Sequence, residues 1–179
     1  MTGAPGTARE CFALAEVPTV RCGRCRGGTA GLCPLSFRTE GFLNYGDVLV
    51  TNKQKALEIH KRGFNCAQSV LCTCGEYTGL DEKTALAISG GFGCGMRCGE
   101  ICGAVSGAMM AIGLCFPYNE SGDAQSRNRV AALGRELTAD FEATYGCMRC
   151  RDLKRAGFSC DELIAYEAEK AMEIIKNNI

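Results

Sequence analysis

The stretch that decides the fold is ICGAVSGAMMAIGLCF, residues 101–116, the longest apolar run in the chain. It ends at Pro117 and falls short of the roughly 20 residues that a bilayer-spanning helix needs. Gly103, Gly107 and Ala111 recur every four residues, so they share one face of a helix. Small side chains on that face let neighbouring helices come close. The stretch therefore predicts a buried helix rather than a membrane span.

Helical patterns continue on both sides of this stretch, from Asp47 to the C-terminus. Asn65 and Ser159 are each followed three residues later by Gln or Glu, the pattern of a capping box that opens a helix. No alternation of apolar and polar residues, which would indicate a strand, follows Asp47. The sequence therefore predicts an all-α domain, a compact bundle of about five to six helices. These helices are expected, in chain order, over residues 51–62, from 65, over 81–89, 101–116 and 121–145, and from 159.

A glycine-dense stretch, GGFGCGMRCG at residues 90–99, interrupts the helical patterns. Glycine loses much conformational freedom on folding, so this composition disfavours a stable helix and predicts a loop. No Gly-Lys-Ser/Thr sequence follows it, so it is not a phosphate-binding loop. We expect it to let the backbone pass close to a sulfur site and to supply N–H donors there.

Charge and hydropathy indicate a soluble protein with no attraction to polyanions. Hydrophobic residues make up 46% of the chain, and the 20 Lys and Arg residues balance the 20 Asp and Glu residues. This balance argues against nucleic-acid or anionic-membrane partners. Residues 1–20 lack the basic start and apolar run of a secretory signal, so we expect a cytoplasmic protein.

Residues 1–46 differ from the helical domain at 47–179: Gly, Pro, Thr and Arg are frequent, and no helical or strand period persists. The sequence CGRC at 22–25 is half of a zinc-ribbon ligand set, and the other cysteines here are too unevenly spaced to complete it. We expect this extension to pack little against the domain. Translation from a non-AUG start at Val48 or Val50 would leave it out of the native product.

Cysteine is the outlier of the composition, with 14 residues in 179. Stable disulfides are rare in a reducing cytoplasm, so clustered cysteines there are more often metal ligands or catalytic thiols, although several here should be plain buried side chains. Cys66, Cys102, Cys150 and Cys160 are each expected at or near a helix start. Free N–H groups and the helix dipole favour thiolates at such positions. These four residues are therefore the candidate catalytic, cofactor-binding and metal-binding thiols.

Other cysteines are weaker candidates. Cys94 and Cys98 lie four residues apart ahead of Cys102, and Cys147 forms a CxxC with Cys150, so these three are secondary candidate ligands. No CxxC is followed by His, which argues against covalent haem. Cys72 and Cys115 are expected to be replaceable side chains of the core, and His60 is expected on the surface.

The runs GFNCAQSV, CGAVSGA, CRDL and CDEL, which begin at residues 63, 102, 150 and 160, resemble the C_GCAxxG_C_C family in order and spacing. The resemblance covers about residues 50–178. Members of that family are described as redox-active and have four hallmark cysteines and a CGAxxG motif, which residues 102–107 match. The resemblance implies redox chemistry at Cys66, Cys102, Cys150 and Cys160, with Gly103 and Gly107 beside the site.

Three functions remain open on the sequence. The first is an oxidoreductase or electron-transfer protein that uses thiol/disulfide exchange or an iron–sulfur cluster, with a redox partner that the sequence does not identify. The second is a structural or interaction module with a four-cysteine zinc site. The third is a helical scaffold, and an oligomer is compatible with each. The first two require the four sulfurs to converge beneath the glycine-dense stretch, where crowding without a metal or disulfide would raise thiol pKa values.

Overall fold

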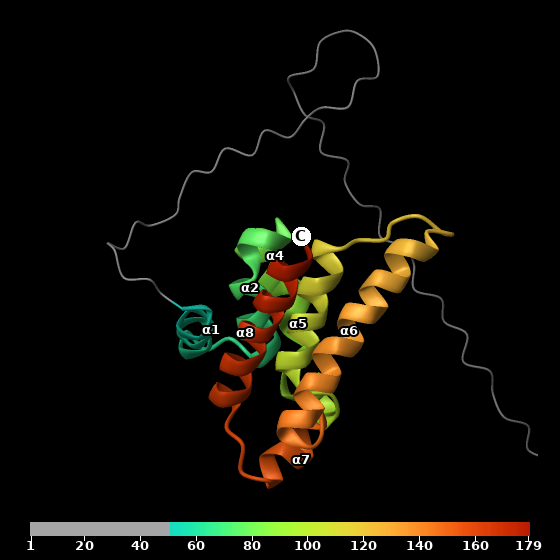
Figure 1. Ribbon diagram of the computed structural model, residues 1–179. Coiled ribbons are helices and arrows are strands. Elements are labelled where there is room, and N and C mark those ends of the chain that lie inside the picture. Colours follow the sequence, from blue (N-terminus) through green and yellow to red (C-terminus); the bar gives the residue numbers. More distant parts are fainter. Residues whose placement is uncertain (1–50) are drawn as a thin grey trace, which may run out of the picture. The chain divides into compact units, whose positions relative to one another are not determined.

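The structure, a computed structural model, describes residues 51–179, and the expected extension at 1–46 lies outside these residues. The described chain is all-α, as predicted (Figure 1). Within it, a single isolated β-bridge joins Ile101 to Arg149. Six of its eight α-helices have eight residues or more, in line with the expected number. In chain order they are α1 (Asn52–Lys61), α2 (Cys66–Thr73), α3 (Gly75–Thr78), α4 (Glu82–Ser89), α5 (Gly103–Cys115), α6 (Ala124–Tyr145), α7 (Cys150–Arg155) and α8 (Cys160–Asn178).

Helix α5 occupies the centre of the bundle and packs against α2, α6 and α8, while α1 packs against α2 and α8 (Figure 1). Its small residues allow a close approach to α2. A Cβ atom added to Gly107 would lie 2.5 Å from the carbonyl oxygen of Ala67, and one added to Gly103 would lie 3.1 Å from Cys66 Cβ. The predicted small-residue face of 101–116 is therefore the surface on which α2 packs. None of the helices described is long and apolar enough to span a membrane.

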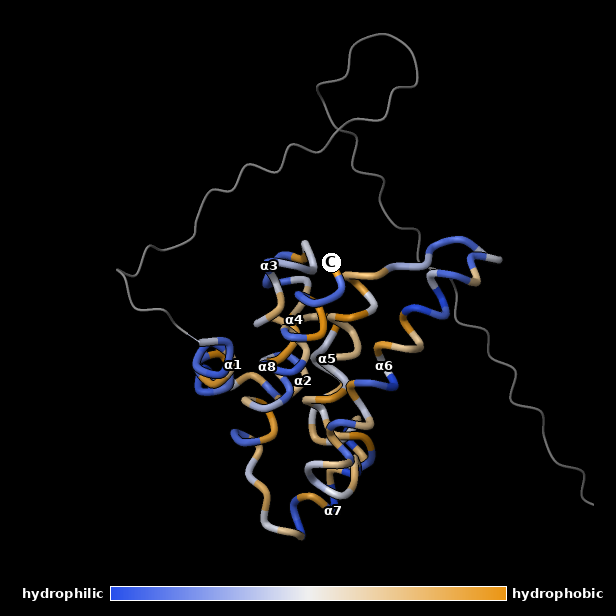
Figure 2. The backbone as a smooth tube through the Cα atoms, viewed as in Figure 1, coloured by the Kyte–Doolittle hydropathy of each residue, from blue (hydrophilic) through white to orange (hydrophobic). Residues whose placement is uncertain are grey.

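The two longest helices, α6 and α8, bury one face each. On α6 the buried residues Leu133, Leu137 and Phe141 recur at helical spacing, and Figure 2 shows long hydrophilic stretches elsewhere on α6. A second stripe on α8 completes the core. It consists of Leu163, Ile164, Ala168, Ala171, Ile174 and Ile175.

Two boundaries differ from the sequence prediction, each for a local reason. Helix α6 begins at Ala124 rather than near residue 121, because Asp123 is its cap and accepts a hydrogen bond from the Ser126 backbone N–H at 2.9 Å. The helix that begins after Asn65 is shorter than the apolar pattern in the sequence, which extends to Tyr77. It ends at Thr73, and a separate turn, α3, starts at Gly75 after the cap residue Cys74.

The glycine-dense stretch is a tight, strained segment rather than an open loop. It forms a 3₁₀ turn, η1 (Gly90–Phe92), and a π-type turn, η2 (Gly95–Gly99). Cys94, Met96 and Arg97 have positive φ angles of 54°, 54° and 63°, and such backbone costs about 1–3 kcal/mol per residue. Side chains hold the segment in place: Arg97 donates to the carbonyl of Gly90, and Arg151 donates to the carbonyl of Cys98, both at 2.8 Å.

Candidate functional site

The four candidate cysteines all occupy helix starts. Cys66, Cys150 and Cys160 are the first residues of α2, α7 and α8, and Cys102 is the cap residue of α5. At α2, Asn65 Oδ1 accepts from the backbone N–H of Ala67 at 3.0 Å, and at α8 the hydroxyl of Ser159 accepts from that of Glu162 at 3.1 Å. Because these caps define the helix starts, they also fix the positions of the two cysteines that follow them.

The fold brings these four residues, which we call the cysteine cluster, near one another. Cys66 lies against the start of α5, since a Cβ atom added to Gly103 would lie 3.1 Å from Cys66 Cβ, and both Cys160 and Cys102 are near enough to raise its pKa. Cys150 interacts in turn with Cys102 and Cys160. Electrostatic interactions of this kind weaken with distance, so the four sulfurs, although far apart in the sequence, share one region of the domain.

A short piece of paired backbone fixes Cys102 beside Cys150. The N–H of Cys102 donates to the carbonyl of Met148 at 2.9 Å, and the N–H of Cys150 donates to the carbonyl of Glu100 at 2.6 Å. The carboxylate of Glu100 also accepts two hydrogen bonds from the guanidinium of Arg149, at 2.9 and 3.1 Å. The two cysteines are thus tied together through main-chain bonds that do not depend on their own side chains.

Three thiols of the cysteine cluster, those of Cys66, Cys102 and Cys150, have raised pKa values and are held in their neutral form. Burial, followed by repulsion from Cys160 and Cys102, raises the pKa of the Cys66 thiol far above its ordinary value. Burial also raises the pKa of Cys102 to about 11, although the backbone N–H groups of Ala104 and Val105 oppose the rise. The helix start therefore has the expected effect on Cys102, but desolvation outweighs it.

Donor atoms for a metal are present, but they are not grouped as ligands. Across residues 51–179, no three His, Cys, Asp or Glu side chains lie together in a way that could hold a metal ion. The four thiols suit zinc or an iron–sulfur cluster by their chemistry alone. Both cofactors therefore stay predictions.

A protein-family model described as "Putative redox-active protein (C_GCAxxG_C_C)" matches residues 64–174, which include all four cysteines of the cluster. The chain belongs to the C_GCAxxG_C_C family. No curated protein and no solved structure matches it significantly.

The CGAxxG motif of this C_GCAxxG_C_C protein has a clear structural basis. Cys102 caps α5, and Gly103 and Gly107, one turn apart, make the contact with α2. A Cβ at position 103 would lie 3.1 Å from both Cys66 Cβ and the carbonyl oxygen of Phe92. The two glycines therefore let α2 and α5 approach closely enough to bring Cys66 next to Cys102, while contact of these glycines with a cofactor stays a prediction.

The three secondary candidates in this C_GCAxxG_C_C protein separate into two groups. Cys94 is exposed and interacts with both Cys66 and Cys150. Cys98 is also exposed, and its thiol donates to the carbonyl of Gly95 at 3.4 Å. Cys147 is partly buried and packs against the core. Among the interactions of the described residues, only those of Cys94 connect a secondary candidate with the cysteine cluster.

Two charged residues at the site were not predicted from the sequence. Lys154 is exposed, and its ammonium group is near Cys160, Cys150, Cys94 and Cys66, which raise its pKa in that order of strength. The signal was available, because Lys154 follows Cys150 by four residues on α7 and so shares its helix face. Glu167 could also have been recognised from the sequence, because it lies among the apolar residues that α8 buries in the core.

Glu167 should make the stability of this C_GCAxxG_C_C protein fall with pH. The residue has no exposed surface, and neither carboxyl oxygen has a hydrogen-bond partner among the described residues. Burial, reinforced by Asp140 and opposed by Lys170, raises the pKa of Glu167 from 4.5 to about 8. The folded state thus keeps a proton that the unfolded chain releases, so the stabilising effect is full below pH 4.5 and is lost as pH rises to about 8.

Urea unfolding of the wild type and Glu167→Gln across this pH range measures the effect. Glutamine cannot ionise, so the unfolding free energy of the variant should fall less than that of the wild type as the pH rises from 4.5 to about 8. Parallel pH profiles for the two proteins would contradict the assignment to Glu167.

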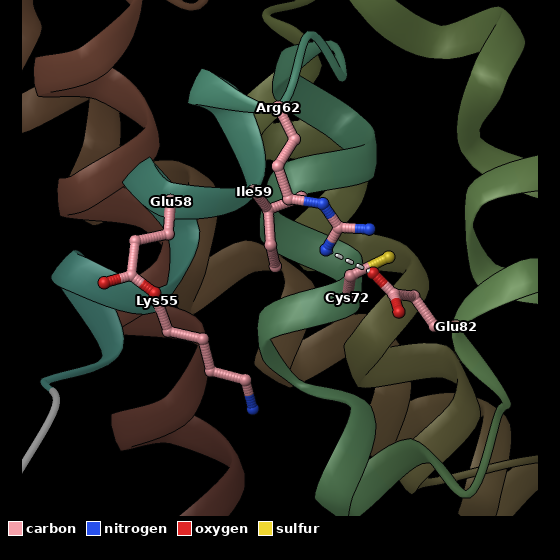
Figure 3. Close-up of a pocket in the computed structure, with 6 residues that line it drawn as sticks. All are labelled: Lys55, Glu58, Ile59, Arg62, Cys72 and Glu82. Carbon is pink, nitrogen blue, oxygen red and sulfur yellow. Dashed lines mark hydrogen bonds and ion pairs between the residues drawn. The ribbon is translucent and has the colours of Figure 1, made fainter. Parts of the chain in front are cut away.

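Cys72 lies in a different environment, as Figure 3 shows. It lines a cavity of about 300 Å³ beside the ion pair between Arg62 and Glu82, whose closest atoms are 2.6 Å apart. Burial raises the pKa of Cys72 to about 11, and no cysteine of the cluster contributes to that shift. Replacing Cys72 with alanine should therefore cost about 1 kcal/mol in unfolding free energy, with thiol reactivity of the cluster unchanged. Urea unfolding and thiol titration of the variant test this, and an altered cluster reactivity would count against it.

Proposed function

We propose that the protein is a thiol redox protein in which Cys66 and Cys160 are reversibly oxidised to a disulfide by an external disulfide. The observation that supports this most strongly is the proximity of these two thiols: each is the first residue of a different helix, and Cys160 raises the pKa of Cys66 more than any other thiol does. Residues far apart in the sequence are thus positioned as a dithiol pair. The family description, redox-active, agrees with this class of chemistry.

The reaction proceeds by two exchanges. A protein thiolate attacks one sulfur of the external disulfide, a mixed disulfide forms, and the first substrate thiolate leaves and takes up a proton. The second protein thiolate then attacks the protein sulfur of the mixed disulfide and expels the second substrate thiolate, which is also protonated. Two protein thiols become one disulfide, and one external disulfide becomes two thiols. Lys154, close to both Cys66 and Cys160, stabilises the thiolates that attack.

Cys102 and Cys150 form the second pair of the cysteine cluster. Cys102 neighbours both Cys66 and Cys150, and Cys150 also neighbours Cys160. A disulfide between Cys66 and Cys160 can therefore pass to this pair by exchange within the cluster. The buried position of Cys102 and Cys150 protects that disulfide from external thiols.

An iron–sulfur cluster is the second candidate, because four neighbouring thiolates would lose their mutual repulsion on binding a cationic centre. Cys66, Cys102, Cys150 and Cys160 would hold it, and it would supply one-electron transfer. Zinc would use the same four sulfurs and supply a structural cross-link instead. Since the described residues do not group three ligands, we assign no step to a metal.

One set of measurements on the full-length protein distinguishes these functions. Protein purified without oxygen is analysed for iron, acid-labile sulfide and zinc, then treated with glutathione disulfide, alkylated and digested for disulfide mapping. We expect a bond between Cys66 and Cys160 that dithiothreitol reverses. Stoichiometric iron and sulfide would favour the second candidate, and stoichiometric zinc with unreactive thiols would overturn the redox assignment.

A further inference from the structure

We propose that Cys94 is the thiol that attacks the external disulfide and passes the oxidation on to Cys66. This inference rests on the proposed dithiol function and adds to it a third reactive thiol, outside the four that the family motif contains. Cys94 is exposed, lies between the starts of α2 and α7, and is held there by strained backbone.

Accessibility separates Cys94 from the cysteine cluster. Cys66, Cys102 and Cys150 are only 7%, 2% and 6% exposed, and Cys160 is partly buried. A disulfide exchange needs the attacking sulfur to approach the substrate in line with its S–S bond, so a buried thiol reacts slowly with an external disulfide. Cys94 is exposed and can meet the substrate without rearrangement of the helices.

The residues on either side of Cys94 place it between Cys66 and Cys150. A Cβ atom added to Gly93 would lie 2.4 Å from Cγ of Asn65, the cap residue just before Cys66. A Cβ atom added to Gly95 would lie 2.7 Å from Cys150 Cβ. The backbone before Cys94 therefore presses against the start of α2, and the backbone after it presses against the start of α7.

The backbone at Cys94 has a conformation that residues other than glycine rarely adopt. Its φ angle is 54°, and Gly95, Met96 and Arg97 continue with φ angles of 64°, 54° and 63°, so a left-handed turn projects from this point. Such strain persists only where the surroundings enforce it, and it is concentrated at functional sites. The ammonium group of Lys154 is close to Cys94 as well as to the cluster, which gives the exposed thiol a cationic neighbour.

The transfer takes three exchanges. Cys94 attacks the external disulfide, forms a mixed disulfide and releases one substrate thiolate, which is protonated. Cys66 then attacks the Cys94 sulfur, forms a Cys66–Cys94 disulfide and releases the second substrate thiolate, also protonated. Cys160 attacks the Cys66 sulfur, forms the final disulfide and releases Cys94 as a thiol. The net change equals that of the proposed function, and Cys94 is regenerated.

The test compares Cys94→Ser with Cys98→Ser in the full-length reduced protein. Cys98 is a matched control, because it is exposed in the same strained segment but has no described interaction with the cluster. Glutathione disulfide is the probe, and mass spectrometry of quenched samples gives the rate at which the bond between Cys66 and Cys160 forms. Cys94→Ser should lower this rate by about 10-fold or more, since no exposed thiol next to the cluster remains, while Cys98→Ser leaves it unchanged. The final fraction of disulfide at a fixed glutathione ratio should not change in either variant.

Cys66→Ser provides a direct readout, because it should accumulate glutathione on Cys94. Cys94→Asn is the second variant, since asparagine tolerates a positive φ, and both Cys94 variants must retain the wild-type melting temperature. Equal rates for Cys94→Ser, Cys94→Asn and the wild type would overturn the inference, as would a shifted final disulfide fraction. If the wild type forms no Cys66–Cys160 disulfide although Cys94 takes up glutathione, the proposed function fails while Cys94 is still the attacking thiol.

Discussion

Replacing Cys66 with serine should abolish formation of the Cys66–Cys160 disulfide and slow release of the second thiol of an external disulfide by on the order of 100-fold or more. Cys66 has three neighbours among the thiols, since Cys160, Cys102 and Cys94 all raise its pKa. Serine keeps the size of the side chain but cannot form a disulfide. The measurement is the release of the two glutathione thiols in a single turnover of the reduced protein, together with disulfide mapping of the oxidised variant.

Cys72→Ser is the matched control for this prediction. Cys72 lies on the same helix and is similarly buried, 8% against 7% exposed, so both variants bury a hydroxyl at a comparable cost of about 1–3 kcal/mol. Only Cys66 belongs to the cysteine cluster. A comparable loss of activity in the two variants would indicate that unfolding, rather than thiol chemistry, explains the effect, and retained activity in Cys66→Ser would exclude Cys66 from the reactive pair.

Local sequence signals predicted the helices and the positions of the four cysteines on them well. The caps Asn65 and Ser159 define the starts of α2 and α8, so Cys66 and Cys160 follow directly from short-range hydrogen bonding. The apolar run at 101–116 likewise became α5, with its small residues facing α2. These features depend on neighbours within one or two helical turns, which a single sequence contains.

Features that depend on packing were not available from the sequence. Glycine content predicted an irregular segment at 90–99, but the left-handed turn exists because Gly93 and Gly95 press against Asn65 and Cys150, which come from other parts of the chain. The pKa of Cys102 also depends on packing, because burial raises it while the free N–H groups at the helix start lower it. Helix position alone predicted a lowered thiol pKa, whereas the folded environment raises it.

The second large effect is expected at Gly107, where alanine should destabilise the protein by about 1–3 kcal/mol. The added Cβ would lie 2.5 Å from the carbonyl oxygen of Ala67 and 3.1 Å from its Cα. Both are backbone atoms of α2, so no side chain can move aside, and the two helices must separate. Because Cys66 precedes Ala67 on α2, we also expect slower formation of the disulfide between Cys66 and Cys160.

Gly113→Ala is the matched control, since it makes the same substitution on the same helix. A Cβ atom at position 113 meets no atom within 4 Å, so alanine adds helix propensity without a clash and should stabilise the protein by about 0.5–1 kcal/mol. The urea concentration at the midpoint of unfolding should therefore fall for Gly107→Ala and rise for Gly113→Ala. Equal stability of Gly107→Ala and Gly113→Ala would mean that α2 and α5 are not held at the close distance that brings Cys66 next to Cys102, and the cysteine cluster would lose its structural basis.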